Sequence, residues 1–479
     1  MSASFLWYDL ETFGRDPRRS RIAQFAAIRT DAELRETGEP VSLFCRPADD
    51  LLPSPGATLI TGITPQRALA EGLSEAEFVA RIHDELATPG TCAVGYNSIR
   101  FDDEFVRFAL YRNFHEPYER EWKNGNSRWD LLDVLRLAAA LRPEGLEWPR
   151  REDGGTSFRL EDLATANGVR EGDAHEALSD VRALLGLARR LRAAQPRLWQ
   201  YAFELRDKRR VAGLIDIGGM TPLLHISSRY PATSQCAQLV VPVARHPRIE
   251  SRVIVAGLAR DPDDWLDLDP GDIADRLYTP AADLPEGVER VPLKEVHTNK
   301  CPVLLPLAHV RPADFERLGI DVDAALARAA RLRATPDLAE RVRRVFAAER
   351  QQAAADADAA LYDGFASDAD RRACQRVRSS SVADLAALET SFGEGRYRDL
   401  LFRYRARNWP ESLSADERLR WDDYRRRRLG SAEAGLSEYD FTSYRAEIAT
   451  LRAQHGPGPA QALLDALQAW GDRLEADLA

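Results

Sequence analysis

The sequence of 479 residues has only five cysteines, only two methionines and no long apolar run. The cysteines are scattered and odd in number, so they fit neither a zinc site nor a disulfide framework, and a reducing cytoplasm is the expected location. No apolar stretch approaches the ~18–20 residues of a membrane span, and the N-terminus shows no basic-then-apolar signal peptide. A Walker lysine motif is also absent, which argues against ATP use.

The composition is typical of a globular protein, with 44% hydrophobic and 30% charged residues, and the length suffices for roughly two to four domains. The formal net charge is −10. Net charge does not decide whether a polyanion binds, because binding depends on where the basic residues cluster. We therefore expect grooves lined by basic residues on a protein whose net charge is negative.

Two carboxylates stand close together near the start of the chain. Residues 5–11 are otherwise apolar and predict a buried strand, on which Asp9 and Glu11 share one face. Neighbouring buried carboxylates repel each other, and a bound cation relieves that repulsion. An all-oxygen ligand set favours Mg²⁺ or Mn²⁺ over zinc. The alternative is that one carboxylate caps a loop while the other is solvated.

A second acidic motif follows another predicted strand at residues 91–96. Asp102 opens the helical pattern that comes next. An acid in the first turn also favours the helix dipole, so this pattern alone does not choose among Asp102, Asp103 and Glu104.

The third motif is His175-Glu-Ala-Leu-Ser-Asp180. Apolar residues at helical spacing place Asp180 early on a helix. His175 does not share an ideal helix face with Asp180, which puts it at the helix start or in the preceding loop. A histidine is the usual proton acceptor near neutral pH, and a surface histidine at a helix N-terminus is the alternative.

Together the three motifs resemble those of the DEDD family of 3′→5′ exonucleases, in the subgroup whose last motif is His-x4-Asp. The family pattern Asn-x3-Phe-Asp selects Asp102 over Asp103. The residues that match catalytic positions are Asp9, Glu11, Asp102, His175 and Asp180. Further stretches resemble the bacterial exodeoxyribonuclease I family, and they cover nearly the whole chain. They include residues 8–14, 23–31, 59–65, 126–133, 299–304 and 403–408.

This resemblance implies an enzyme that degrades single-stranded DNA processively from the 3′ end to 5′-mononucleotides, in DNA repair and recombination. It implies two Mg²⁺ ions per active site, about 3.5–4 Å apart, with Mn²⁺ able to substitute. The implied metal ligands are Asp9, Glu11, Asp102 and Asp180. His175 is expected to take the proton of the attacking water. A monomer is expected.

The resemblance also implies contacts with DNA. Thr12 and Phe13 follow the metal pair, where the terminal nucleotide must lie, although a core position is the alternative for Phe13 and for Phe101. Arg159 is expected at a phosphate, with a solvated arginine as the alternative. The predicted substrate-binding residues are Glu11, Thr12, Phe13, Phe101, Arg159 and Lys300.

Members of the family bind the acidic, apolar C-terminal tail of single-stranded DNA-binding protein. A receptor for that tail needs arginines around an apolar pocket. The positions that the resemblance implies are Arg142, Tyr201, Arg311, Leu326 and Arg333. Pro306 stands where a polar residue is expected, which departs from the family pattern.

Patterning divides the chain into three domains of a multidomain α/β protein. Residues 1–195 predict a mixed sheet flanked by helices, which the resemblance names a ribonuclease H-like DEDDh exonuclease domain. Residues 196–350 contain short β-rich runs between Pro and Gly turns, and the family's middle domain is SH3-like with helical additions. Residues 351–479 predict a C-terminal helical domain.

Three charged features have structural interpretations beside functional ones. Residues 402–409 interleave aromatics with arginines, either as a single-strand surface or as an amphipathic helix with snorkelling arginines. Residues 425–428, four arginines, predict a solvated face. Asp130 and Asp133 predict a cap or a partner for Arg128.

Two rival functions differ in what they need from the sequence. A proofreading or RNA-trimming relative uses the same five residues but is usually little more than the first domain, and the sequence does not display how a 2′-hydroxyl is treated. A non-catalytic single-strand binding protein on this fold is expected to have lost a metal carboxylate. All four carboxylates are present here.

Overall fold

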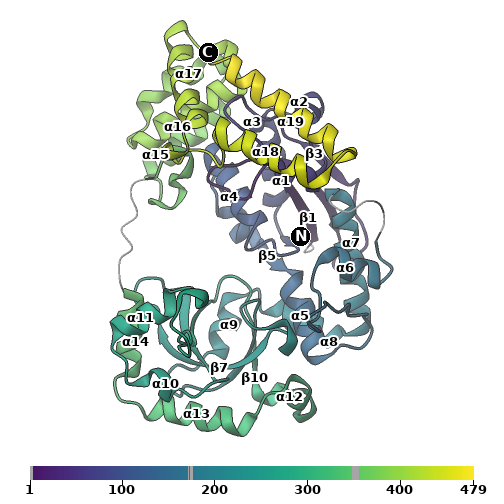
Figure 1. Cartoon of the computed structure of the whole chain (residues 1–479), viewed down its shortest axis with the longest axis vertical. Helices are drawn as coiled ribbons and strands as arrows, with labels where there is room; N and C mark the ends of the chain where they lie inside the picture. The colour runs from purple at the N-terminus through teal and green to yellow at the C-terminus, as the bar shows by residue number, and fades with distance from the viewer. Residues whose placement is uncertain (1–3, 171, 173–175, 348–354) are drawn as a thin grey trace. The chain divides into compact units, whose positions relative to one another are not determined.

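The computed structural model describes residues 4–170, 172, 176–347 and 355–479 (Figure 1). These residues form two compact units. The first contains residues 4–127, 172, 176–183 and 355–479, and the second contains 128–170 and 184–347. The C-terminal segment therefore belongs to the same unit as the N-terminal strands.

The first unit is built on a mixed sheet that includes strands in the order β3-β2-β1-β4. β1 (Ser4–Thr12) pairs antiparallel with β2 (Ile22–Thr30) and parallel with β4 (Thr91–Gly95), and β2 pairs antiparallel with β3 (Val41–Phe44). Residues 5–8 of β1 are buried on both faces of the sheet, which explains why this run is continuously apolar. The predicted mixed sheet is confirmed.

Helices α3 (Glu75–Ala87) and α4 (Asp102–Arg112) cover a face of this sheet. Phe78 of α3 and Phe105 of α4 share a buried cluster with Leu6 and Phe25 of the strands. A capping box between Ser74 and Glu77 begins α3. The other elements of this part are α1 (Pro55–Thr61), α2 (Pro65–Glu71), η1 (Glu119–Glu121), η2 (Lys123–Gly125) and the start of α7 (Ala177–Ala194).

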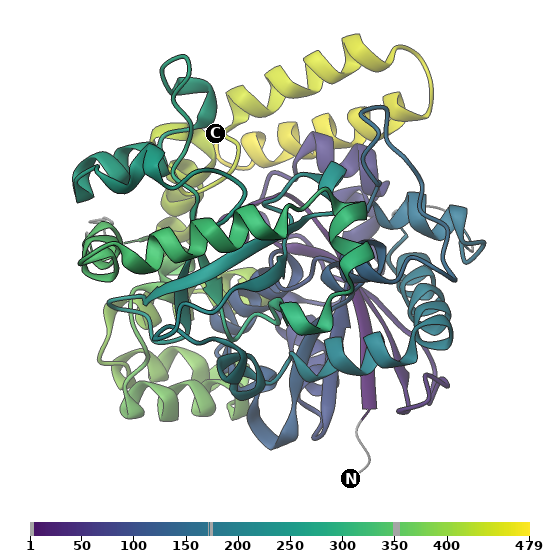
Figure 2. The same cartoon turned by 90° about the horizontal axis from the view of Figure 1, so that it is seen from below.

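The C-terminal residues add a helical layer to the first unit. Helices α18 (Phe441–His455) and α19 (Pro459–Ala476) lie side by side (Figures 1 and 2), and Leu52 joins their apolar cluster. The layer also contains η6 (Ala357–Tyr362), α15 (Asp368–Ser379), η7 (Val382–Ser391), α16 (Gly395–Asn408), η8 (Pro410–Ser412), α17 (Ala415–Gly430) and η9 (Ala432–Ala434). The predicted helical character of this segment is confirmed.

The arginine run 425–428 differs from the prediction. Arg425 and Arg428 are 4% and 1% exposed, and the Arg428 guanidinium donates to the backbone oxygens of Asp50 and Leu436 at 2.7 and 2.6 Å. A fully solvated face is therefore wrong, because one side of α17 packs against the N-terminal part of the unit. Arg426 and Arg427 are exposed, as predicted.

The second unit contains an antiparallel sheet in the order β10-β6-β7-β8-β9. Its strands are β6 (Leu223–Ile226), β7 (Ala237–Arg245), β8 (Arg252–Gly257), β9 (Leu293–His297) and β10 (Val303–Pro306). The first three coincide with β-rich runs that the sequence predicts at residues 223–227, 238–243 and 252–256, whereas β9 and β10 are not predicted as strands.

Strand β5 (Ser127–Asp130) leads into the second unit. The helices that follow in this unit are α5 (Leu131–Leu141), α6 (Leu160–Ala166), the rest of α7, α8 (Pro196–Glu204), α9 (Lys208–Leu214), η3 (Ala232–Ser234), α10 (Asp263–Leu266), α11 (Pro270–Tyr278), η4 (Ala281–Asp283), η5 (Leu307–His309), α12 (Pro312–Leu318), α13 (Val322–Ala334) and α14 (Leu338–Ala347). Across the described parts of both units, none of the helices has the length and apolarity needed to cross a bilayer.

Candidate active site

Asp9 and Glu11 project from the same face of β1, as the strand period predicts. They lie opposite Ala26 and Gln24 of β2. Glu11 is 8% exposed and Asp9 is half-buried. The backbone that carries the two carboxylates is held by its pairing with β2, and the preceding residues 4–7 of β1 are also paired with β4.

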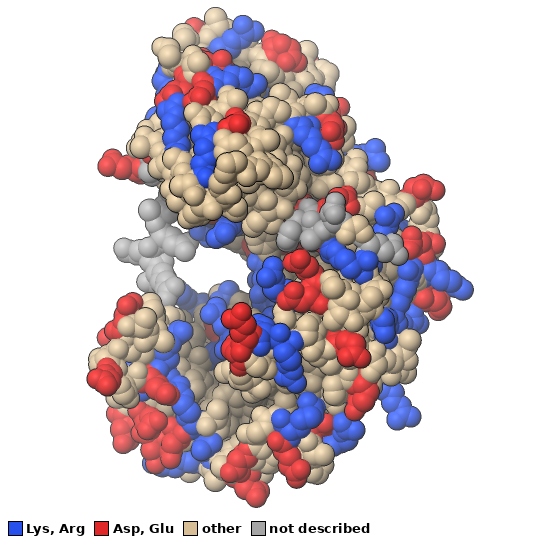
Figure 3. All heavy atoms as spheres, turned by 45° about the vertical axis from the view of Figure 1, so that its right-hand side comes forward, with Lys and Arg blue, Asp and Glu red and all other residues tan. Residues whose placement is uncertain are grey.

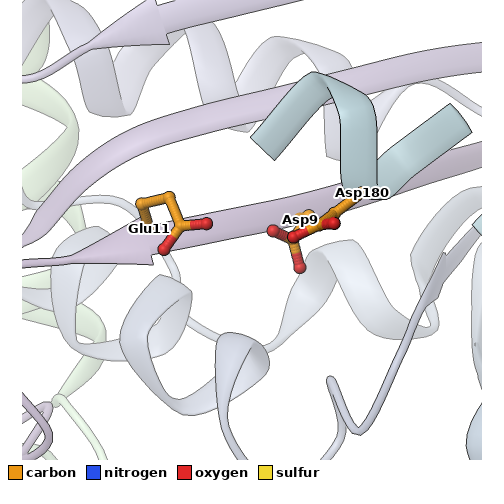
Figure 4. Close-up of side chains that lie close together, drawn as sticks. All are labelled: Asp9, Glu11 and Asp180. Atoms are coloured by element: carbon orange, nitrogen blue, oxygen red, sulfur yellow. The ribbon is translucent and has the colours of Figure 1, made fainter. Parts of the chain in front are cut away.

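Asp180 reaches the same place from the first turn of α7 (Figure 4). The carboxylates of Asp9, Glu11 and Asp180 have oxygens that all lie within 4.8 Å of one another. Three residues from two distant parts of the sequence are thereby brought together.

Asp102 is the first residue of α4 and is 4% exposed. The turn before it is tight, because a side chain at Gly95 would meet Ser98 Cβ at 2.4 Å. The negative charge of Asp102 acts on both Asp9 and Glu11. The fourth predicted carboxylate therefore belongs to the same electrostatic cluster.

The carboxylates disturb one another's protonation. Burial, followed by the charges of Asp102, Glu11 and Asp180, raises the pKa of Asp9 well above its ordinary value. Burial, followed by the charges of Asp180, Asp102 and Glu176, raises the pKa of Glu11 to about 8. Such repulsion is what a bound cation removes.

Asp103 has a different role from its neighbour. Its Oδ1 accepts a hydrogen bond from the Tyr8 hydroxyl at 2.8 Å and another from the Arg120 guanidinium at 2.6 Å. All three side chains are buried. Asp103 is therefore occupied by structural partners, which agrees with the family pattern that selects Asp102.

The donor set fits a hard divalent cation. The clustered oxygens come only from carboxylates, the ligands that Mg²⁺ and Mn²⁺ prefer. Their mutual repulsion is an independent sign that positive charge is needed there. His175, the predicted proton acceptor, lies outside the described residues.

The predicted substrate residues of the first unit take different positions. Thr12 ends β1, and its hydroxyl donates to the Gly14 backbone oxygen at 2.7 Å. Phe13 is 2% exposed and packs with Ala23 and Leu51, so its placement supports the core alternative. Phe101 is half-buried against Phe105, with ring centroids 5.0 Å apart.

Arg159 and Lys300 belong to the second unit. Arg159 is exposed directly before α6, with Glu161 Oε2 at 3.5 Å. Lys300 is half-buried in the turn between β9 and β10. Both stay predictions as DNA contacts.

Part of the predicted partner site forms a cavity of about 450 Å³ in the second unit. Arg142 and Tyr201 line it with Leu137, Leu141 and Leu305. Arg311 donates to the backbone oxygen of Leu141 at 3.1 Å, and Asp314 lies between Arg311 and Arg142 at 2.8 and 3.0 Å. Among the residues described, Leu326 and Arg333 lie on α13 and do not line this cavity.

The remaining charged features are structural. Asp130 caps α5 by accepting from the Leu132 amide at 3.1 Å, as predicted, while Asp133 pairs with Arg136 at 2.7 Å. The arginines of residues 402–409 are buried in ion pairs, so neither the DNA surface nor the snorkelling helix describes them. These pairs are Arg403–Asp356, Arg405–Glu417 and Arg407 with Asp50 and Asp358.

The surface charge is mixed. On the face in Figure 3, basic and acidic side chains alternate in small groups over the described residues. On this face, small groups of basic side chains therefore stand among the acidic ones, although the net charge of the chain is negative.

Carboxylates gathered on the central strand of a mixed sheet and on a helix beside it define a metal-dependent nuclease site on a ribonuclease H-like fold. Family models agree along the chain: Exonuclease matches residues 6–188, Exonuclease I SH3-like domain matches 206–348 and Exonuclease I C-terminal domain matches 355–474. The chain belongs to the exodeoxyribonuclease I family, and it is an exonuclease. The predicted fold class is confirmed.

Individual relatives match over nearly the full length. Exodeoxyribonuclease I of Escherichia coli (strain K12) is 48% identical over 88% of this chain and 89% of its own. The exonuclease I structure from Methylocaldum szegediense has a TM-score of 0.94 at 48% identity and covers 98% of this chain and 99% of its own. A zinc-bound complex of the E. coli enzyme with single-stranded DNA has a TM-score of 0.94 at 44% identity, over 99% and 100%.

Proposed function

We propose that this protein degrades single-stranded DNA from the 3′ end, releasing 5′-mononucleotides processively, in DNA repair and recombination. The observation that carries the proposal is the carboxylate cluster of Asp9, Glu11 and Asp180, with Asp102 beside it. The E. coli relative, which forms a complex with single-stranded DNA, supports the substrate class.

Four carboxylates would hold two Mg²⁺ ions in this site. These residues are Asp9, Glu11, Asp102 and Asp180. When bound, the ions supply Lewis-acid stabilisation of the charge that develops on the scissile phosphate, together with a more acidic water. The carboxylates supply the negative charge that keeps the ions in place, and pairing with β2 fixes the direction in which Asp9 and Glu11 point.

His175 is the proposed general base, which removes the proton of the attacking water. Thr12 follows Glu11 directly, and we propose that its backbone orients the terminal nucleotide. With Phe13 buried, Phe101 is the better candidate for contact with a base, because its ring is only half-buried. Arg159 and Lys300 would contact phosphates from the second unit.

The polarity and substrate class can be tested together. A 5′-labelled single strand, the same strand with a 3′-phosphate block, a duplex and an RNA strand are digested with Mg²⁺. The proposal predicts mononucleotide release from the open DNA single strand and much slower digestion of the other three. Equal digestion of the RNA strand, or attack on the blocked strand, contradicts it.

The cavity beside Arg142 and Tyr201 is the proposed receptor for the C-terminal tail of single-stranded DNA-binding protein. Leucines supply apolar walls, and Arg142 supplies positive charge for an acidic peptide. Asp314 already forms ion pairs with Arg142 and Arg311. A carboxylate of the bound peptide would therefore share these two arginines with Asp314.

Fluorescence anisotropy with a labelled tail peptide tests this receptor. Arg142→Ala and Tyr201→Ala are each expected to weaken binding by at least about tenfold, because both line the cavity. Arg426→Ala, an exposed arginine of the other unit, is the matched control and should bind normally. An unmodified protein that does not bind the peptide refutes the receptor.

A further inference from the structure

The loop that joins β1 to β2, residues 13–21, begins two residues after Glu11 in the sequence. The Thr12 hydroxyl donates to the backbone oxygen of Gly14 at 2.7 Å, and the Phe13 amide donates to the Arg21 oxygen at 2.9 Å. These bonds couple the conformation of this β1–β2 loop to Thr12, the residue next to Glu11. Thr12 also pairs with Ile22 of β2 after a register shift.

A glutamate from the C-terminal layer accepts hydrogen bonds from two backbone amides of this loop. Glu438 Oε1 accepts from the Asp16 amide at 2.6 Å, and Oε2 accepts from the Arg15 amide at 3.2 Å. The Glu438 carboxylate is half-buried. It lies so close to the loop that a Cβ at position 14 would stand 2.6 Å from both of its oxygens, so a larger residue there requires the Glu438 carboxylate to move.

Other contacts hold the two ends of the loop. The Ser54 amide donates to the Phe13 oxygen at 2.6 Å, and the Ser54 hydroxyl lies 3.4 Å from the Tyr439 hydroxyl. At the far end, Arg428 Nη2 donates to the Arg19 oxygen at 2.8 Å. In the middle of the loop, Arg112 Nη1 donates to the Pro17 oxygen at 2.9 Å, whereas the amides of Arg15 and Asp16 donate to Glu438.

We propose that Glu438 is a positioning residue for the exonuclease reaction. Through the amides of Arg15 and Asp16 it fixes Gly14, whose carbonyl in turn orients Thr12 beside the metal carboxylates. This inference rests on the proposed function. Pairing with β2, opposite Ala26 and Gln24, holds Asp9 and Glu11 without Glu438, so the loss of Glu438 affects the alignment of the 3′ end and not the metal site.

The test uses Glu438→Ala and Glu438→Gln in the full chain. Glu438→Ala is expected to lower kcat on single-stranded DNA about tenfold, because small misplacements of reacting groups are costly. The KM for a long strand and the Mg²⁺ concentration for half-maximal rate should stay unchanged. Glu438→Gln keeps one acceptor oxygen and should lie between the alanine variant and the unmodified protein. Hydrogen exchange should show faster exchange of the Arg15 and Asp16 amides in the alanine variant.

Glu116 provides a matched control in the same unit. Its half-buried carboxylate also accepts two backbone amides, from Tyr118 at 2.7 Å and Glu119 at 2.5 Å, but in a different loop. Glu116→Ala should leave kcat unchanged. The inference is overturned if Glu116→Ala loses as much kcat as Glu438→Ala, or if Glu438→Ala keeps the kcat of the unmodified protein.

Gly14→Ala approaches the same contact from the other side. The added methyl collides with the Glu438 carboxylate and with Ser20 Oγ, at 2.6 and 2.7 Å, so kcat should fall. Combined with Glu438→Ala, its effect should be smaller than in the unmodified background. Fully additive effects contradict the inference. If the unmodified protein has no nuclease activity, the proposed function is refuted instead. The hydrogen-exchange experiment still tests whether Glu438 protects the Arg15 and Asp16 amides.

Discussion

The Tyr8 hydroxyl donates a hydrogen bond to Asp103 at 2.8 Å, and this contact joins the two elements that carry metal carboxylates. Tyr8 precedes Asp9 on β1, and Asp103 follows Asp102 on α4. The Arg120 guanidinium, 2.6 Å from the same oxygen, completes a buried triad. The triad fixes the distance between strand and helix, and with it the relation of Asp9 to Asp102.

Tyr8→Phe should lower the free energy of unfolding by about 1 kcal/mol, since Asp103 keeps Arg120 as its partner. The rate of cleavage in a single turnover should fall a fewfold, because α4 gains freedom relative to β1. Urea denaturation and single-turnover kinetics measure the two effects.

Tyr444→Phe is the control, because it also removes a buried hydroxyl, one that donates to the Leu467 oxygen at 3.1 Å in the C-terminal layer. It should cost similar stability and leave the rate unchanged. A rate loss as large as that of Tyr8→Phe would show that general loosening, and not the triad, is responsible.

Asp9→Asn should lower activity by several orders of magnitude without harming the fold. Burial and the neighbouring carboxylates penalise charge at this position when no metal is bound, so neutralising it relieves repulsion. Differential scanning fluorimetry should show an equal or higher Tm without metal, and a smaller rise when Mg²⁺ is added. A large fall in Tm without metal would contradict the view that the cluster is built for cations.

Arg407→Ala should destabilise the first unit by about 3–5 kcal/mol, because it leaves two buried carboxylates without their main partner. Its guanidinium lies 2.8 Å from Asp50 and 2.5 Å from Asp358. Arg426→Ala is the comparison: Arg426 pairs with Asp423 at 2.9 Å on the exposed side of α17, and its loss should cost less than about 1 kcal/mol. Equal effects in urea denaturation would contradict the assigned role of the buried network.

The same network predicts how stability depends on acid. Burial by itself would raise the pKa of Asp358, but Arg407 and Arg403 outweigh it and hold that pKa well below the ordinary range. An unfolded aspartate titrates near about 3.9, so this stabilisation is complete above about pH 4 and is lost as the pH falls toward the folded pKa. Asp358→Asn should therefore flatten the fall in unfolding free energy below about pH 4. An unchanged slope would mean that Asp358 does not bind the proton.

The sequence predicted what depends on local order. Strand alternation placed Asp9 and Glu11 on one face, and helical spacing put Asp180 in a first turn, because both patterns are read over a few residues. The choice of Asp102 over Asp103 needed the family pattern. The triad with Tyr8 and Arg120 then supplies the physical reason, which depends on a long-range contact that spacing does not encode.

The arginines of the C-terminal layer show where sequence reasoning fails. Alternating arginines and aromatics have the same pattern whether they face solvent, DNA or buried acids. The partners Asp50 and Asp358 lie far from Arg407 in sequence, and neither belongs to a recognisable motif. For Phe13 the sequence leaves both a core position and a DNA contact open, because its burial depends on Leu51 and Ile63 of another segment.

The most direct test of the metal site is a Mg²⁺ titration of cleavage by the unmodified protein and by Asp180→Asn, with circular dichroism to verify folding. Asp180 reaches the site from α7, a helix distant in sequence from the strand of Asp9 and Glu11. The account predicts a folded variant whose cleavage of single-stranded DNA is reduced by several orders of magnitude at every Mg²⁺ concentration. A folded variant that reaches the unmodified rate at the same Mg²⁺ concentration would contradict it.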